Sequence, residues 1–353
     1  MKGASLFSSA GIAETYLKDI GIDIVVANEL LEKRAKFHKH LYPDCEMIQG
    51  DITNDNIFNL IVNKCIENNT EFLLATPPCQ GFSLIGKNKT EKDVLNDEKN
   101  YLIFKVFDLI DKIDFNYILI ENVPRFIKTY FRYEDSYKTL LEILHLKYSD
   151  KYIIESDILN AKDYGVPQSR PRAIIKMYKK NLKWGWPEKE PEILLKDVLW
   201  DLPSLESGES SNIKWHYSRK HNINHILWMK HTKTGETAFN NDVHYPLKSD
   251  GHKIKGYPAT YSRMRWDRPA PTVTIRNDAI SSQTNVHPGR KLPDGTYSDA
   301  RVLTVYELLI VSSLPKNWDI PEWATEILIR QVIGEAVPPL MIKKVLLSIE
   351  REI

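Results

Sequence analysis

Residues 4–29 read ASLFSSAGIAETYLKDIGIDIVVANE and contain the three parts of a βαβ unit. The runs Ala4–Phe7 and Ile24–Asn28 have the apolar, β-branched character of buried strands. The segment Glu14–Ile20 between them is predicted to be a helix that Gly21 ends. Because a helical crossover joins strands that run in the same direction, this stretch predicts the start of a parallel sheet.

The same alternation continues to about residue 178 and predicts an α/β fold with a mostly parallel, doubly wound sheet. Further strands are expected at Glu46–Ile48, Phe72–Ala75, Tyr117–Ile120, Tyr152–Ser156 and Ala173–Met177, and further helices at Leu30–Leu41, Asn56–Glu67 and Asn100–Asp111. After Trp186 the chain becomes rich in Gly, Pro, Asn, Ser, Thr and His, which indicates a second, loop-rich domain. Helical periodicity returns at Thr304–Val311, Glu326–Ile333 and Leu340–Arg351.

The charge of the chain is unevenly distributed. Its 353 residues include 48 Lys and Arg against 47 Asp and Glu, and 42% of them are hydrophobic, which is typical of a globular protein. Residues 211–290, however, hold 13 Lys and Arg but only 5 Asp and Glu, a net charge of +8, so the remainder carries −7. This window also contains 7 of the 10 His residues and eight Trp, Tyr or Phe residues. It therefore predicts a surface that binds a polyanion.

Several classes of protein and site are disfavoured by the sequence. The three cysteines form no CxxC pair and leave an odd thiol, so neither a disulfide framework nor a zinc site is expected. His216, His221 and His225 lack carboxylate or cysteine companions in a metal-binding motif, and we expect no metal. Trp215, Trp228 and Trp266 are interpreted mainly as core residues. No stretch of the sequence approaches the roughly 18 consecutive apolar residues that a membrane helix needs.

Small and acidic residues follow the first three predicted strands. Residues 8–11 (Ser-Ser-Ala-Gly) lie where doubly wound sheets bind cofactors. Glu29 ends the second strand and suits ribose hydroxyls, whereas Asp51 follows the third and suits an adenine amino group. Each feature alone is equally compatible with a tight turn or a helix N-cap, but together they favour a nucleoside-binding edge of the sheet.

The next two strand ends carry a thiol and a carboxylate. Cys79 lies in Thr76-Pro77-Pro78-Cys79-Gln80-Gly81-Phe82-Ser83, where two prolines argue against core packing and favour a positioned nucleophile. Glu121 lies in Ile120-Glu121-Asn122-Val123, directly after the fifth strand. A nucleophile and an acid are thus expected at one edge of the sheet.

Together these motifs resemble those of the cytosine-5 DNA methyltransferases, in the same order along nearly the whole chain. The Pro-Cys-Gln and Glu-Asn-Val segments are similar to the nucleophile and acid motifs of that family. Residues 168–172 (Gln-Ser-Arg-Pro-Arg) are similar to its Gln-x-Arg-x-Arg motif, and residues 268–272 (Arg-Pro-Ala-Pro-Thr) to the segment that closes its target-recognition region. Two departures are the serine-rich cofactor loop, where glycine is more usual, and Glu335, where Asn is commoner.

The resemblance implies a Rossmann-like methyltransferase fold, S-adenosyl-L-methionine as cofactor with S-adenosyl-L-homocysteine as product, and a flipped cytosine as target. It implies catalytic roles for Cys79, Glu121, Arg170 and Arg172. The implied cofactor-binding residues are Phe7, Ser8, Ser9, Ala10, Gly11, Ile12, Glu29, Leu30, Asp51, Ile52, Pro78, Leu102, Glu335 and Ala336. The residues expected to contact DNA are Gln80, Ser83, Arg263 and Arg265.

The expected organisation is a catalytic domain at 1–180, a target-recognition domain at 181–320, and a C-terminal helical segment at 321–353 that returns to the catalytic domain. The expected partners are double-stranded DNA and, functionally, a restriction endonuclease, with the protein acting as a cytoplasmic monomer of a prokaryote or phage. Three alternatives stay open: a tRNA cytosine-5 methyltransferase on the same scaffold, a non-catalytic DNA-binding relative, and a small-molecule oxidoreductase. Intact Cys79, Glu121 and Arg172 argue against the second, and the poor glycine pattern argues against the third.

Overall fold

The structure is a computed structural model that describes residues 1–78, 101–248, 250–254 and 256–350. The chain forms two compact units. Unit 1 contains residues 1–160, 171–188 and 342–353, and unit 2 contains residues 161–170 and 189–341. The sequence suggested boundaries at residues 180 and 320 between domains of different function. These boundaries stay a prediction.

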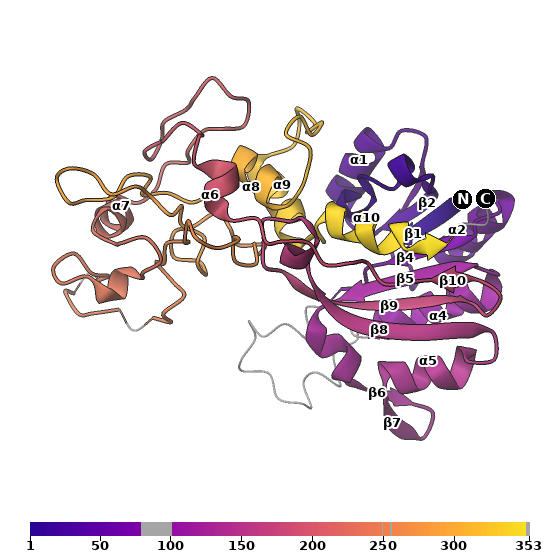
Figure 1. Cartoon of the computed structure of the whole chain (residues 1–353). Helices are drawn as coiled ribbons and strands as arrows, with labels where there is room; N and C mark the ends of the chain where they lie inside the picture. Colours follow the sequence, from indigo (N-terminus) through magenta and orange to yellow (C-terminus); the bar gives the residue numbers. More distant parts are fainter. Residues whose placement is uncertain (79–100, 249, 255, 351–353) are drawn as a thin grey trace. The chain divides into compact units, whose positions relative to one another are not determined.

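A seven-stranded sheet forms the centre of unit 1, in the order β3-β2-β1-β4-β5-β9-β8 (Figure 1). Its strands are β1 (Lys2–Leu6), β2 (Asp23–Glu29), β3 (Glu46–Gln49), β4 (Phe72–Ala75), β5 (Tyr117–Asn122), β8 (Tyr152–Asn160) and β9 (Pro171–Lys179). The first five strands in this order are parallel to one another, whereas β9 is antiparallel to both β5 and β8. The predicted α/β fold and mostly parallel sheet are confirmed.

Unit 1 also contains helices. They are α1 (Glu32–Leu41), α2 (Asp55–Glu67), α4 (Ile103–Lys112), α5 (Leu140–Tyr148) and α10 (Pro339–Leu347), most of which belongs to unit 1. Apolar side chains of α2, α4 and α5 pack with those on one face of the strands in a buried core that includes Leu73, Phe107, Ile118 and Met177. Strands buried on both faces read as continuous apolar runs, and β4 and the first part of β5 have that composition.

Unit 1 differs from the expectation in several places. Residues 14–20 are not one helix but parts of two 3-10 turns, η1 (Ile12–Glu14) and η2 (Lys18–Ile20). The Gly11 carbonyl accepts the Glu14 amide at 3.0 Å, which is the i to i+3 bond of a 3-10 turn, and it also accepts the Tyr42 hydroxyl. The hairpin of β6 (Tyr130–Tyr133) and β7 (Ser136–Thr139), which follows η4 (Pro124–Lys128), was not anticipated, nor was α5.

The predicted C-terminal helix is shorter than expected. It ends at Leu347, and the following β11 (Ile349–Glu350) pairs antiparallel with β10 (Lys183–Trp184). The indole of Trp184 donates a hydrogen bond of 2.8 Å to the carbonyl of Val345. Residues 342–350 are therefore built into unit 1, beside a segment more than 150 positions earlier in the chain.

Unit 2 is rich in loops and contains short helices: η5 (Ala161–Tyr164), α6 (Leu195–Leu199), α7 (Ile223–Lys230), η6 (Ala238–Asn240), α8 (Val305–Val311) and α9 (Glu326–Glu335). A small apolar cluster around Trp228, Met229 and Val286 packs α7 against the loops. The core interpretation of Trp228 is confirmed, since its side chain is 8% exposed.

A buried charge cluster supports these loops. The fully buried Arg301 guanidinium pairs with Glu307 at 2.7 Å and with Asp299 at 2.8 Å, and Glu307 also caps α8 by accepting from the Thr304 amide. Burial alone would raise the pKa of Glu307, but the guanidinium outweighs it and holds the pKa down to about 2. The carboxylate therefore stays ionised and paired throughout the neutral range.

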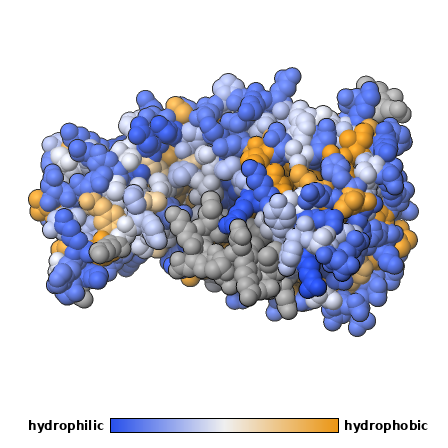
Figure 2. Space-filling view, turned by 90° about the horizontal axis from the view of Figure 1, so that it is seen from below, coloured by the Kyte–Doolittle hydropathy of each residue, from blue (hydrophilic) through white to orange (hydrophobic). Residues whose placement is uncertain are grey.

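The protein surface is mixed. The face shown in Figure 2 is mainly hydrophilic, with apolar side chains gathered in small separate areas. Within the described residues, no helix has both the length and the apolar character that crossing a membrane requires.

Replacing one partner of the buried pair tests its contribution. We expect Glu307→Gln to lower the free energy of unfolding by about 3 to 5 kcal/mol, because Arg301 keeps a buried charge without its main counter-ion. Urea denaturation followed by tryptophan fluorescence measures the change. The control Glu322→Gln removes the same charge at an exposed position and should change stability by less than about 0.5 kcal/mol. Equal losses in the two variants would contradict the role given to the cluster.

Candidate active site at the carboxyl edge of the sheet

The strand order reverses between β1 and β4, because the chain passes outward from β1 to β3 and then returns to the other side of β1. In open α/β sheets, ligands bind at such a switch point, outside the carboxyl ends of the strands. The loop 7–12 follows β1, and residues 76–78 follow β4. The sequence-predicted cofactor and nucleophile segments therefore begin on adjacent strands at this edge.

The loop after β1 has an unusual backbone. Phe7, Ser9 and Gly11 all have positive φ, at 59°, 50° and 72°. Side-chain-bearing residues rarely adopt this conformation, and such strain is commonly found at functional sites. The Ser9 amide donates to a Glu29 oxygen at 2.9 Å, and the Ser8 amide donates to the Asn28 carbonyl at 3.1 Å. The loop is thus held against the end of β2 by hydrogen bonds to Glu29 and Asn28.

The remaining predicted loop residues, Ala10 and Ile12, are both buried. Behind them, Gly11 has no room for a side chain, since an added Cβ would lie 2.4 Å from Tyr42 and 2.8 Å from His38. The buried His38 ring nitrogen Nε2 lies 2.9 Å from the Glu14 carboxylate. Sequence analysis missed these three supporting residues of the loop, because a lone His, Tyr or Glu on a helix or turn carries no positional signal.

The ends of β2 and β3 present the two predicted carboxylates. Each Glu29 oxygen accepts one backbone N–H, from Ser9 and from Leu31, and a carboxylate oxygen can accept a second hydrogen bond. Asp51 is exposed, and its Oδ1 accepts both the amide and the hydroxyl of Thr53. The side chain of Leu30 is 55% exposed, and it offers apolar surface next to Glu29. Ile52 is buried.

Side-chain amides tie this edge together. Asn28 donates to the carbonyls of Ile48 at 2.9 Å and Gly50 at 3.1 Å, which joins the ends of β2 and β3. Asn122 donates to the Pro77 carbonyl at 3.0 Å, which fixes the chain just before Pro78 and Cys79. Of the two, only Asn122 belongs to a motif that the sequence singled out.

The predicted nucleophile, Cys79, lies outside the described residues, as do Gln80 and Ser83. The other two cysteines are buried, and burial raises the pKa of Cys65 to about 11 and that of Cys45 further still. Because the thiolate is the reactive form, neither is suited to nucleophilic catalysis. Leu102, at the start of α4, is partly buried and packs against the core of unit 1.

Glu121 and Arg172 meet as an ion pair. The Arg172 Nε lies 2.8 Å from a Glu121 oxygen, and both side chains are largely buried, with exposed fractions of 11% and 8%. Glu121 lies opposite Ile174 in the β5–β9 register, so Arg172 is its diagonal neighbour on the same face of the sheet. The sequence-predicted acid and its arginine are thus brought together.

Arg170 has a different environment. It belongs to unit 2, is 2% exposed and donates to the carbonyls of Val273 at 2.6 Å and of Gly334 and Glu335 at 3.0 Å each. These contacts hold the end of α9 against the segment around residue 273. Gly334 is needed there, because a Cβ would lie 2.2 Å from the Thr274 carbonyl oxygen. Arg170 therefore has a structural role in unit 2, and Ala336 forms the C-cap of α9.

The two arginines that the sequence predicted to contact DNA, Arg263 and Arg265, differ sharply in their exposure to solvent. Arg263 is 1% exposed, and its guanidinium donates to the carbonyls of Met229, His287 and Asp299. The prediction for Arg263 is corrected on this ground: its donors are committed inside unit 2, so it organises loops rather than contacting bases. Arg265 is exposed and pairs with Asp267 at 2.8 Å.

The histidines of residues 211–290 make separate structural contacts. His216 is buried between the Thr304 hydroxyl at 3.0 Å and the Pro203 carbonyl at 3.1 Å, and His225 packs on Trp228 and Tyr261. Over the ranges that the structure describes, no three His, Cys, Asp or Glu side chains come together in a metal-binding group.

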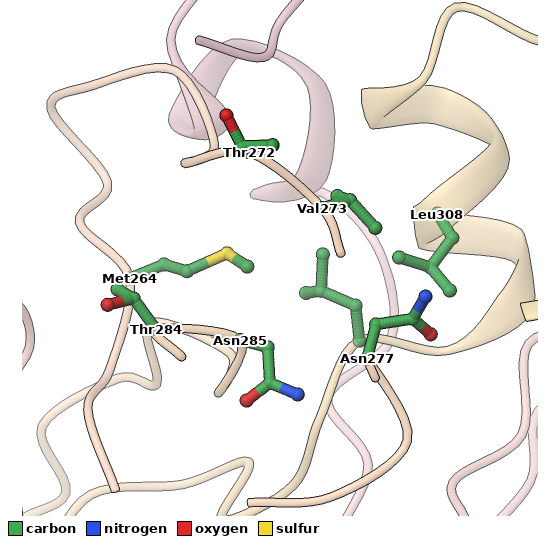
Figure 3. A pocket seen from close by; sticks show the side chains of 8 residues that line it. Met264, Thr272, Val273, Asn277, Thr284, Asn285 and Leu308 are labelled. Carbon is green, nitrogen blue, oxygen red and sulfur yellow. The ribbon is translucent and has the colours of Figure 1, made fainter. Parts of the chain in front are cut away.

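An enclosed cavity inside unit 2 is too small for a nucleoside. Figure 3 shows its lining, which includes Met264, Thr284, Asn285 and Leu308. Its volume is about 10 Å³, roughly the space of one water molecule. The buried Oδ1 of Asn285 has no hydrogen-bond partner within the described chain, which suits an internal water rather than a ligand.

Comparison with known proteins identifies the family. Residues 1–351 match the model of the C-5 cytosine-specific DNA methylases. The chain belongs to this family. It is 52% identical over 350 residues to the type II methyltransferase M1.HgaI of Avibacterium volantium, covering 99% of this chain and 98% of that protein. It is 27% identical over 341 residues to M1.HphI of Haemophilus parahaemolyticus, covering 95% and 83% of the two chains.

Solved structures support the fold of this methylase. The Entamoeba histolytica methyltransferase EhMeth matches with a TM-score of 0.67 at 15% identity, covering 99% of this chain and 97% of that one. A Spodoptera frugiperda DNMT2 variant matches with a TM-score of 0.61 at 17% identity, covering 98% of each chain. The Rossmann-like methyltransferase fold implied by the motifs is therefore confirmed.

The packing of Tyr42 and His38 against Gly11 can be tested by substitution. We expect Gly11→Ala to lower the free energy of unfolding by about 2 to 4 kcal/mol, because it adds both a left-handed backbone cost and a clash with Tyr42. The matched control is Gly295→Ala, which has a positive φ of 86° but no atom within 4 Å of the added Cβ. Urea denaturation compares the two. Equal losses of unfolding free energy in the two variants would show that the backbone conformation, and not the contact with Tyr42 and His38, restricts this position.

Proposed function

We propose that the chain is the modification enzyme of a type II restriction–modification system, which methylates carbon 5 of one cytosine in a specific duplex DNA sequence. The observation that carries the catalytic part is the buried Glu121–Arg172 pair at the same sheet edge as Pro77 and Pro78, which directly precede Cys79 in the sequence. The restriction role rests on the 52% identity to the type II methyltransferase M1.HgaI. Its family makes the chain a methyltransferase.

The cofactor of such a methyltransferase is S-adenosylmethionine, which supplies an electrophilic methyl group on a sulfonium. The residues at the ends of β1, β2 and β3 fit this molecule. The remaining acceptor capacity of Glu29 suits ribose hydroxyls, exposed Leu30 suits one face of the adenine ring, and the exposed Asp51 suits its amino group.

Carbon 5 of cytosine is a poor nucleophile, so the ring needs activation before it can accept a methyl group. In our proposal the Cys79 thiolate adds to carbon 6, while Glu121 donates a hydrogen bond or proton to ring nitrogen 3 as negative charge develops there. Arg172 holds the Glu121 carboxyl in place and binds the ring carbonyl oxygen. After methyl transfer, a base removes the hydrogen from carbon 5, and Cys79 leaves carbon 6.

This chemistry requires the cytosine to leave the base stack, since carbon 6 cannot be reached inside a duplex. Extrusion costs a few kcal/mol, which contacts to the flipped base and the phosphates must offset. The net charge of +8 in residues 211–290 supplies phosphate-binding capacity in unit 2. The exposed Arg265 is retained as a proposed DNA contact, together with Gln80 and Ser83.

Bisulfite sequencing of DNA from an Escherichia coli host expressing the chain tests the activity. We expect one cytosine in one short sequence to be fully protected from conversion. Cys79→Ala should abolish this protection and lower methyl transfer by more than about 10⁴-fold while duplex binding persists, because only the covalent step is lost. Cys65→Ala, which removes a buried thiol of raised pKa, should remain active.

A duplex with 5-fluorocytosine at the target position separates the mechanism from binding alone. Fluorine cannot leave carbon 5 as a proton does, so the wild-type chain should stay covalently joined to the DNA in the presence of S-adenosylmethionine. The complex should survive denaturing electrophoresis, and Cys79→Ala should not form it. Protection without any covalent complex would overturn the thiol mechanism, and methylation of tRNA but not duplex DNA would overturn the proposed substrate.

A further inference from the structure

A groove of about 400 Å³ on unit 2 combines aromatic and basic side chains. The residues that define it, which we call the indole groove, are Trp200, Lys233, Trp266, Arg290, Lys291 and Tyr297. They come from three separate parts of unit 2: the end of α6, the segment after α7, and the loops at 266 and 290–297. None of them belongs to the motifs that carry the methyl-transfer chemistry.

The side chains of Trp266 and Trp200 differ in how firmly they are held. Trp266 is fixed, because its Nε1 donates a hydrogen bond of 2.8 Å to the Gly289 carbonyl. Its ring meets Trp200 edge to face, with centroids 5.1 Å apart. The Trp200 side chain itself is 41% exposed, an unusual state for so large an apolar surface. The groove therefore offers a fixed aromatic wall and an accessible ring beside it.

Cations surround the exposed ring. The Arg290 guanidinium carbon lies 5.0 Å from the centroid of Trp200, and the Lys196 ammonium lies 5.8 Å from it. Lys233 and Lys291 are exposed at the groove, and within the described chain neither has a carboxylate at ion-pair distance. The one acidic side chain of the lining is Glu236, so the groove has a net charge of about +2 from Lys233, Arg290 and Lys291.

We infer that the indole groove binds the DNA substrate along its strand, with a phosphate on Lys233 and Lys291 and a deoxyribose ring against Trp200. The inference rests on the proposed function, because it names a binding site for the same DNA. Aromatic faces beside lysine and arginine are the combination that holds nucleotides without sequence preference. The unpaired ammonium groups supply charge complementarity to phosphate, and the indole supplies the flat apolar surface.

The lysines are tested by the salt dependence of binding. The probe is a duplex that carries the methylated sequence found by bisulfite sequencing. We expect Lys233→Ala/Lys291→Ala to reduce the slope of log affinity against log salt concentration by about 2, one for each phosphate contact. The control Lys112→Ala/Lys180→Ala removes the same charge from exposed positions of unit 1 and should leave the slope within about 0.5. An unchanged slope in the groove variant would overturn the phosphate contact.

The indole is tested by its own pair of variants. Trp200→Ala should weaken binding of the same duplex by about 5- to 150-fold, as expected for loss of one stacking contact, whereas Trp200→Phe should stay within about 5-fold of wild type. Urea denaturation checks that both variants remain folded. Equal affinities for wild type and Trp200→Ala would overturn the stacking contact.

The outcomes distinguish this inference from the proposed function. If the wild-type chain methylates DNA but the groove variants bind and respond to salt as wild type does, the groove is not a DNA site and the proposed function stands. If the wild-type chain neither methylates nor binds duplex DNA, the proposed function itself fails.

Discussion

The direction of β9 determines where the acid and its arginine meet. β9 is antiparallel to β5, so its first residues lie at the edge of the sheet where β5 ends. Arg172, at the start of β9, therefore reaches Glu121 at the end of β5, although 50 residues separate them in the chain. A parallel β9 would begin at the opposite edge, a full strand length away. The pairing of these two side chains depends on this single reversal in an otherwise parallel series.

The same edge shows how loops that leave a sheet satisfy their polar groups. Backbone carbonyls there have lost their ladder partners, and a buried carbonyl without a partner is costly. Asn28 and Asn122 supply side-chain donors to the carbonyls of Ile48, Gly50 and Pro77, and Glu29 supplies acceptors to the amides of Ser9 and Leu31. Of these bonds, the one from the Ser9 amide to Glu29 holds the serine-rich loop, in which Phe7 and Ser9 have positive φ.

Much of unit 1 could be predicted from its sequence, because buried strands and capped helices have local signals. All seven expected strands occur in the sheet, and Asn54 caps α2. Strand direction has no such signal, so the antiparallel β8 and β9 could not be read from composition. Helix α5 was missed although Thr139 and Glu142 form a capping box. For the site, motif residues predicted Glu121 and Arg172 correctly as neighbours. Exposure depends on tertiary packing, and so the burial of Arg170 and Arg263 could not be foreseen.

Unit 1 is assembled from parts of the chain that are made at different times. Strand β10 cannot pair with β11, and Trp184 cannot bond the carbonyl of Val345, until residues 189–341 have been synthesised. At about 5–20 residues per second this interval is on the order of 10 to 30 s. During translation, the surface of unit 1 that residues 342–350 later cover stays open, and unit 2 has the opportunity to fold first. Completion of the sheet-bearing unit 1 therefore follows the synthesis of unit 2.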